Sequence, residues 1–129
     1  MGYYSQVGLA LTEKAYITLL EALKKDKEYF SEDNYNEILN LINKNVDIHY
    51  HEHTKEKLLI WNWIKWYNSY ASVNYINDFV KSLNTEDYLY IIIEEDGNLT
   101  VDGEFYDNIF GLSWRSELEY SLYEITKGK

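Results

Sequence analysis

Three histidines stand at alternate positions of the segment 46–53, whose sequence is VDIHYHEH. Alternate residues of a β-strand point to the same side, so His49, His51 and His53 would form a row with neighbours ~6.5–7 Å apart. Two neighbours in such a row can share a metal ion, but a catalytic zinc site needs a third ligand from elsewhere in the chain. The alternative is a polar, solvent-facing side of an edge strand. We predict that the histidines lie on such a solvent-facing side and that the protein binds no metal or other cofactor.

The segment 94–107 is rich in acidic residues and contains no basic one. Its acids are Glu94, Glu95, Asp96, Asp102, Glu104 and Asp107. It matches a calcium-binding loop poorly, because Val101 stands where such a loop requires glycine. A carboxylate pair for acid–base hydrolysis would need a concave site. The segment could also be a solvated loop, or a surface that meets Lys and Arg side chains of a partner. We predict that these six residues bind a partner.

Other common signatures of catalysis are missing from the sequence. It contains no cysteine, and its six glycines are scattered rather than grouped in a phosphate-binding loop. No serine lies in a known nucleophile motif. We therefore predict that the protein is not an enzyme.

Acidic charge is concentrated in the last third of the chain. The 129 residues carry a formal net charge of −10. Residues 84–129 hold 11 acids and 3 bases, whereas residues 1–83 hold 11 acids and 9 bases. Such a surface repels nucleic acid and attracts basic partners, although net charge also serves simply to keep a small protein soluble. We expect no direct binding to nucleic acid.

The length and the apolar segments set the expected organisation and location. A chain of 129 residues fits a single domain over 1–129. No apolar stretch approaches the ~20 residues of a membrane span. The first residues lack the basic start and apolar run of a signal peptide. We expect one cytoplasmic domain with no membrane contact.

Hydrophobic periodicity predicts both strands and helices. Alternation predicts strands over 3–11, 46–53, 57–67 and 87–95. Helical spacing predicts a helix capped by Thr12, another that starts near Ser31 and a third over 71–83. This order is that of the ferredoxin-like split βαβ fold. We predict an α+β domain with an antiparallel sheet, helices on one face and an extra helix after the first.

The end of the chain alternates again. One side of it carries Leu112, Trp114, Ser116, Leu118, Tyr120 and Leu122. We predict one long or bent strand here, a C-terminal extension at an edge of the sheet.

The segment 57–67 is apolar on both sides, and its sequence is KLLIWNWIKWY. Simple alternation puts Leu59, Trp61 and Trp63 on one side and Ile60, Ile64 and Trp66 on the other. Some tryptophans would then face away from the helices. That face is either covered by the C-terminal segment, which we favour, or used for self-association as a homodimer.

The segments GYYSQVGLAL, WNWIKWY and YIIIEEDG occur in a composition rich in Asn, Lys, Ile and Tyr. In these features the chain resembles small acidic proteins encoded by phages and prophages of low-GC Gram-positive bacteria. Such proteins are often inhibitors of host defence, including anti-CRISPR proteins, which occupy nucleic-acid-binding surfaces of effector complexes or block their conformational change. The resemblance implies a non-enzymatic inhibitor that binds a basic host protein or ribonucleoprotein complex. Two different functions stay open beside it: a self-associating structural protein, and a metal-dependent enzyme using the histidine row.

Overall fold

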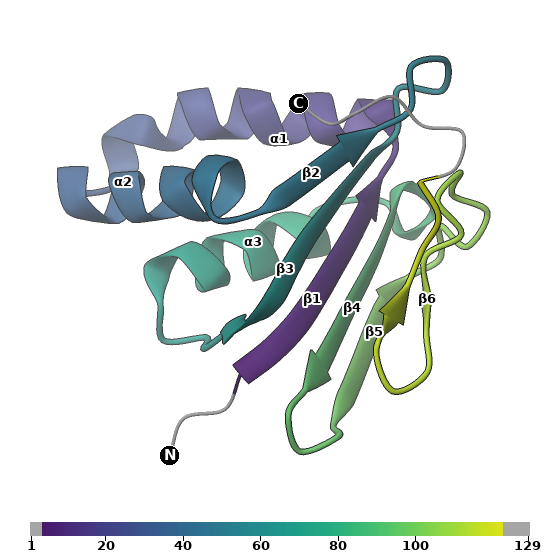
Figure 1. The fold of residues 1–129 in the computed structure, drawn as a ribbon. Coiled ribbons are helices and arrows are strands. Elements are labelled where there is room, and N and C mark those ends of the chain that lie inside the picture. The colour runs from purple at the N-terminus through teal and green to yellow at the C-terminus, as the bar shows by residue number, and fades with distance from the viewer. Residues whose placement is uncertain (1–3, 123–129) are drawn as a thin grey trace.

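A five-stranded antiparallel sheet is the centre of this α+β structure (Figure 1). The computed structural model describes residues 4–122. Within them the strands of the sheet are β1 (Tyr4–Leu11), β2 (Asp47–Tyr50), β3 (Lys57–Lys65), β4 (Tyr88–Glu94) and β5 (Leu99–Gly103). They lie in the order β2-β3-β1-β4-β5, and every neighbouring pair is antiparallel. The first four match predicted strands, whereas β5 occupies a segment that the sequence suggested was a loop.

Three α-helices cover one face of the sheet (Figure 1). They are α1 (Glu13–Asp26), α2 (Glu32–Leu39) and α3 (Ala71–Lys81), with shorter helical turns at Lys27–Tyr29, Asn40–Lys44 and Thr85–Asp87. Leu19, Ile38 and Val80 of the three helices pack in one buried cluster with Leu9 and Trp61 of the sheet. None of the helices in the described residues combines the length and the apolar character needed to cross a bilayer.

The predicted helix starts are confirmed by their caps. The Thr12 hydroxyl accepts a hydrogen bond from the Ala15 backbone N–H at 3.2 Å, and the Ser31 hydroxyl accepts one from Asn34 at 3.1 Å. After α2 the chain makes the π-helical turn Asn40–Lys44. The Leu41 carbonyl in this turn accepts a hydrogen bond from the indole of Trp61 at 2.9 Å, so a buried tryptophan satisfies a carbonyl near the end of the helix.

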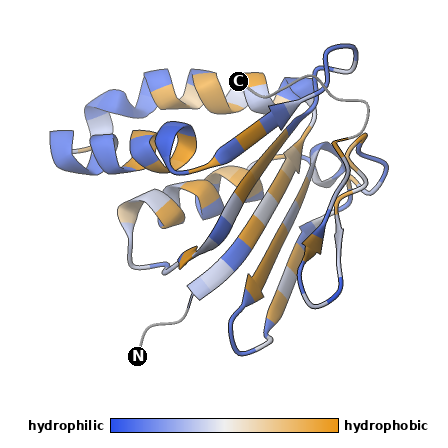
Figure 2. Cartoon of the chain, in the orientation of Figure 1, coloured by the Kyte–Doolittle hydropathy of each residue, from blue (hydrophilic) through white to orange (hydrophobic). Residues whose placement is uncertain are grey.

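The second face of the sheet is also buried. Hydrophobic residues run along the central strands (Figure 2). Those that point away from the helices form a second cluster with the C-terminal segment; it contains Ala10, Leu58, Ile60, Leu89, Ile91 and Ile93 of the sheet, and Phe105, Phe110, Leu112 and Leu118 that cover them. Covering by the C-terminal segment, which we favoured, is confirmed. The side chains through which this face would self-associate are buried within the chain, and the homodimer stays a prediction.

The C-terminal segment does not extend the sheet at an edge, so the prediction of one long strand is wrong. It contains the short strands β6 (Ser113–Trp114) and β7 (Leu118–Glu119), which pair only with each other in the described structure. The alternation was nonetheless informative, because Leu112 and Leu118 are buried. Buried Asn108 organises the preceding loop: its amide donates to the Phe105 carbonyl at 2.8 Å and accepts from the Leu112 N–H at 2.9 Å.

Residues 105–120 form the C-terminal cover of this face, and the cover lies directly on the middle of β1. A Cβ atom on Gly8 would lie 3.0 Å from a Leu118 methyl and 3.3 Å from a Leu112 methyl. The absence of a side chain at Gly8 therefore lets the two layers approach.

We expect Gly8→Val to lower the free energy of unfolding by about 1–3 kcal/mol, because the added methyls collide with Leu118 and overpack this core. Urea denaturation followed by circular dichroism measures the change. Thr100→Val, at an exposed position of β5, is the matched control and should stay within about 0.5 kcal/mol of the wild type. Equal losses in the two variants would contradict the steric explanation.

Candidate functional site

A β-bulge interrupts β3 near its end. The register of pairing with β1 shifts between Trp61 and Ile64. Asn62 and Trp63 therefore lie together opposite the single residue Gln6, which is the pattern of a bulge. Trp63 has a φ of 52°. That left-handed conformation is uncommon for any residue with a side chain and is an outlier for one this bulky.

The bulge changes which side chains share a face. Leu59 and Trp61, before it, share one side as predicted, and that side faces the helices. The extra residue reverses the alternation, so Ile64 and Trp66 also pack on the helical side. Trp63 instead lines a cleft together with residues from the C-terminal segment. The predicted grouping of Trp63 with Leu59 and Trp61, and of Ile64 and Trp66 with the opposite side, is wrong for this reason.

The buried side chain of Gln6 holds the bulge in place. Its Nε2 donates to Asn62 Oδ1 at 2.7 Å, and its Oε1 accepts from the Leu118 backbone N–H at 2.8 Å. Gln6 is only 6% exposed, so losing either partner would leave a buried polar atom unsatisfied. One side chain thus ties the bulge to the C-terminal cover.

A cleft of about 390 Å³ opens beside the bulge. It is lined by the tryptophans Trp63 and Trp114, the aliphatic side chains of Ile93 and Leu99, the acidic turn that contains Glu95, and Arg115. Glu94 also borders the cleft, but it alternates along β4 with Tyr90 and Ile92, so its carboxylate lies on the helical side of the sheet. Trp63 is 39% exposed, and Trp114 is partly buried. The cleft therefore presents aromatic surface and negative charge side by side.

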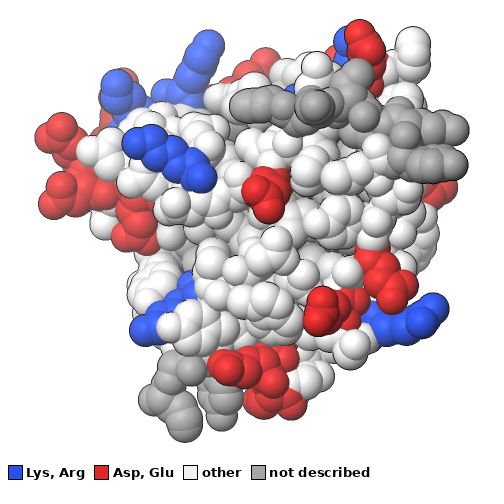
Figure 3. Space-filling model, viewed as in Figure 1, with Lys and Arg blue, Asp and Glu red and all other residues white. Residues whose placement is uncertain are grey.

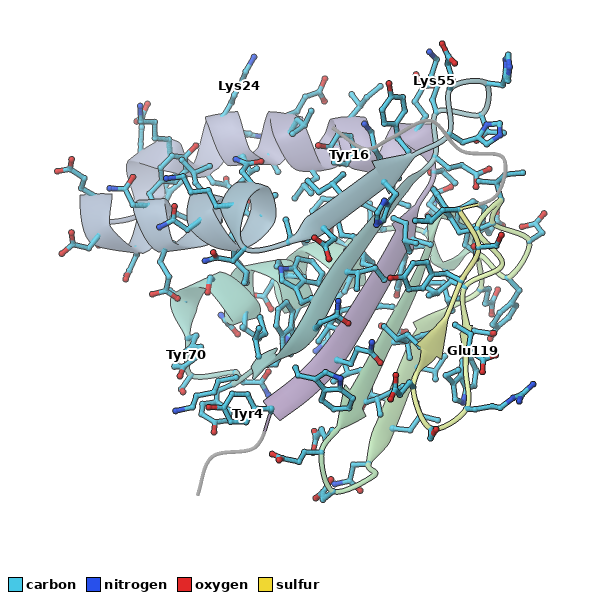
Figure 4. All side chains as sticks on the ribbon, in the orientation of Figure 1. Tyr4, Tyr16, Lys24, Lys55, Tyr70 and Glu119 are labelled. Carbon is cyan, nitrogen blue, oxygen red and sulfur yellow. The ribbon has the colours of Figure 1, made fainter. Side chains whose placement is uncertain are left out.

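Hydrogen bonds fix the acidic turn at this cleft. The Glu95 carboxylate accepts from the Tyr4 backbone N–H at 2.9 Å, and the Asp96 carboxylate accepts from the Asn98 N–H at 3.1 Å. Asn98 also donates through its amide to Glu94 Oε1 at 3.4 Å. Figure 4 shows Tyr4 at the start of β1, the end of the strand that meets this turn.

The predicted acidic site is divided in the structure. Glu94, Glu95 and Asp96 lie at the β4–β5 turn by the cleft. Asp102 lies on β5 opposite Tyr90, on the helical side of the sheet. Asp107 is exposed in the loop after β5. Figure 3 shows acidic side chains in several separate groups on the visible face, rather than as one continuous patch.

Asp102 and Glu104 lie near Tyr88 and affect its pKa. Burial raises the pKa of Tyr88 to about 12, and a hydrogen bond to Asp102 and the negative charge of Glu104 act in the same direction. Glu104 also accepts a hydrogen bond from the Thr85 hydroxyl at 3.3 Å. These two carboxylates therefore have local structural partners away from the cleft.

The histidines do not form the predicted solvent-facing row. β2 ends at Tyr50, and His51 is buried in the following turn, where its Nδ1 accepts from the His53 and Thr54 backbone N–H groups at 3.2 and 3.3 Å. The His49 ring lies 6.2 Å from the ring of Tyr120, centroid to centroid. Within residues 4–122, no group of three His, Cys, Asp or Glu side chains is placed to hold a metal ion.

A second hollow, of about 500 Å³, lies between α2 and the start of α3. Its carboxylate Glu37 accepts hydrogen bonds from the backbone N–H and the hydroxyl of Ser72, at 3.0 and 2.7 Å. Since Ser72 is in the first turn of α3, Glu37 satisfies an N-terminal N–H group of that helix. The Glu37 carboxylate is therefore occupied with holding α2 and α3 together.

Comparison of the chain with protein-family models, curated proteins and solved structures found no match. What the cleft can bind is therefore inferred from its own side chains. Exposed indole rings and carboxylates are groups that bind other molecules, and the cleft by Trp63 is where the described structure combines them.

We expect Trp63→Gly to leave the free energy of unfolding within about 1 kcal/mol of the wild type. Relief of the left-handed conformation, worth ~1–2 kcal/mol, offsets the lost packing of a half-exposed ring. Trp61→Gly is the matched comparison: this ring is 1% exposed, and its loss should cost about 3 kcal/mol or more. Chemical denaturation measures both, and equal losses would show that Trp63 is an ordinary core residue.

A second prediction concerns His49. Burial lowers the pKa of His49, and the nearby Asp47 carboxylate acts in the opposite direction without cancelling the effect. The unfolded chain then binds this proton more readily than the folded one, so the contribution of His49 to stability is present above pH ~6.5 and is lost as the pH falls below that value. Thermal unfolding of the wild type and His49→Gln across this range should show a weaker pH dependence in the variant. An identical dependence would contradict the prediction.

Proposed function

We propose that the chain is a non-enzymatic inhibitor of phage origin, of the anti-CRISPR type, which acts in the cytoplasm of the host cell. It binds a basic surface of a nucleic-acid-handling defence complex through the cleft lined by Trp63, Glu94 and Glu95. The observation that carries this proposal is an exposed tryptophan held in a left-handed conformation at a cleft that the acidic β4–β5 turn borders.

The conformation of Trp63 favours a role in binding. For folding alone, glycine would suit this position better, because a side chain in the left-handed region costs ~1–2 kcal/mol. Strained residues that the surrounding structure holds in place are concentrated at functional sites. Tryptophan is also among the residues most enriched at the energetic centres of protein interfaces. The exposure and the strained conformation of Trp63 therefore support the proposal that this residue anchors a partner.

Charge favours a basic partner. Glu94, Glu95 and Asp96 place three carboxylates at the β4–β5 turn next to the cleft, and the net charge of −10 extends the negative field beyond them. Such a field speeds the encounter with a positive surface and repels nucleic acid. A protein with these properties competes with nucleic acid for its binding site. Asp102, Glu104 and Asp107 contribute to the attraction at longer range.

We also propose that the fold is a ferredoxin-like variant. The strand order β2-β3-β1-β4 and the helices on one face support this assignment. β5 and the C-terminal segment are then additions to that core, and the candidate cleft lies where these additions meet β3.

The proposal predicts that co-expression of the chain protects a target plasmid from destruction by at least one CRISPR effector in a panel of bacterial strains. Glu94→Lys combined with Glu95→Lys should abolish protection, because each reversal places like charge against the partner's basic surface. Plasmid transformation efficiency is the measurement. Glu28→Lys combined with Glu32→Lys is the matched control, since these exposed acids lie near the start of α2, among the helices.

The control variant should protect like the wild type. Protection lost equally in both variants would indicate a requirement for net charge alone. Failure to protect against every effector, with folded protein present in the cells, would rule out the proposed class of inhibitor. Circular dichroism of the purified variants checks that each is folded.

A further inference from the structure

We propose that the cleft between Trp63 and Trp114 binds a single arginine side chain of the partner, with the guanidinium group stacked on indole and held by the Glu95 carboxylate. This inference rests on the proposed function and specifies the chemistry of the partner. It makes the cleft a recognition pocket for one side chain, beyond a general attraction between charged surfaces.

The size of the cleft suits one side chain. Its volume of about 390 Å³ is at the lower end of the ~300–1,000 Å³ typical of ligand sites. Ile93 and Leu99 form apolar walls, and the two tryptophans and Glu95 lie beside them. An aliphatic stem with a planar cationic end is complementary to these walls, because the stem packs on apolar groups and the cation lies against indole and carboxylate.

The tryptophans of the cleft differ from those of the core. The Trp61 indole N–H donates to the Leu41 carbonyl at 2.9 Å, and the Trp66 indole N–H donates to the Tyr90 hydroxyl at 3.0 Å. Within the described residues, the indole N–H groups of Trp63 and Trp114 have no hydrogen-bond partner. Both N–H groups therefore remain able to donate, and the exposed face of Trp63 is available to a ligand, whereas Trp114 also packs against the second core cluster.

The Glu95 carboxylate retains binding capacity. Glu95 uses Oε1 to accept from the Tyr4 backbone N–H at 2.9 Å, and this bond holds the carboxylate beside the cleft. Among residues 4–122 its Oε2 has no hydrogen-bond partner. A guanidinium group matches this arrangement better than an ammonium group, because it stacks on an aromatic face and donates in its plane to carboxylate oxygens.

Arg115 supplies a cation from the same chain at the edge of the cleft. Its Nε lies 3.6 Å from Glu119 Oε2, and the two side chains are 82% and 47% exposed. An exposed pair of this kind is weak, so Arg115 does not hold the cleft closed. Its positive charge instead opposes an incoming guanidinium. Figure 4 shows Glu119 on the side of the sheet away from the helices, where this pair lies.

The test uses the full chain and two short peptides, acetyl-Gly-Arg-Gly-amide and the same peptide with neutral citrulline in place of arginine. Titration is followed by the indole N–H signals in ¹H–¹⁵N NMR spectra, with the Trp63 signal assigned from its absence in Trp63→Gly. We expect the arginine peptide to shift the signals of Trp63 and Trp114. The signals of Trp61 and Trp66 should not move, since both indoles are bonded within the core.

Three variants separate recognition from a structural effect. Glu95→Gln keeps one acceptor oxygen for the Tyr4 N–H but removes the charge and the second acceptor, and we expect it to weaken peptide binding about tenfold. Trp63→Gly should weaken it to a similar degree. Arg115→Gln should have the opposite effect and tighten binding several-fold, because it removes a like charge. A merely structural role would not produce changes of opposite sign.

Equal binding of the citrulline peptide, or no shift of the Trp63 and Trp114 signals, would overturn the arginine pocket. If the pocket fails while Glu94→Lys with Glu95→Lys still abolishes plasmid protection, the proposed inhibitor stands and engages its partner by charge alone. If the peptide binds as expected but no CRISPR effector is inhibited, the pocket stands and the proposed class of target is wrong.

Discussion

The whole structure depends on a sheet with two apolar faces. Antiparallel sheets commonly leave one face to water, but β1 and β4 are buried on both sides along nearly their whole length. The helices cover one face, so the second face needs another layer. Residues 105–120 supply it with little regular structure, and the backbone groups of this segment are partly satisfied by side chains such as Asn108 and Gln6. Gly8 permits its close approach.

The second layer also determines where the candidate site lies. Gln6 bonds to Asn62 in the bulge and to the Leu118 backbone in the cover. Because Gln6 is buried, both bonds must form together for the polar side chain to be satisfied. The bulge, the cover and the position of Trp63 are therefore coupled, and the cleft forms at their junction. A change that loosens the cover is expected to affect the cleft even when it is made at a distant residue such as Gly8.

The sequence predicted the features that depend on local periodicity and caps, and missed those that depend on pairing. Thr12 and Ser31 start helices as their types suggested. β5 was missed because turn residues surround it and its strand conformation comes from pairing with β4. Alternation over 112–122 identified the buried side chains but contains no information on what they cover. The six acids were grouped by closeness in sequence, whereas strand pairing places Asp102 on the helical side. The one local signal of the bulge was Asn62, a polar residue within an apolar run.

Trp61 and Trp63 show how little distinguishes a core residue from a candidate binding residue in this chain. Both belong to one strand, and regular alternation would bury them on the same face. The single extra residue of the bulge separates them: Trp61 has its indole N–H satisfied inside, and Trp63 is turned out to the cleft. The hydrogen bonds of Gln6 to Asn62 and to the Leu118 backbone hold the bulge in which Trp63 has its left-handed conformation. A backbone already held in one conformation loses no further freedom on binding, which lowers the entropic cost of association. Exposure of this tryptophan is thus a consequence of the same interactions that bury the second face of the sheet.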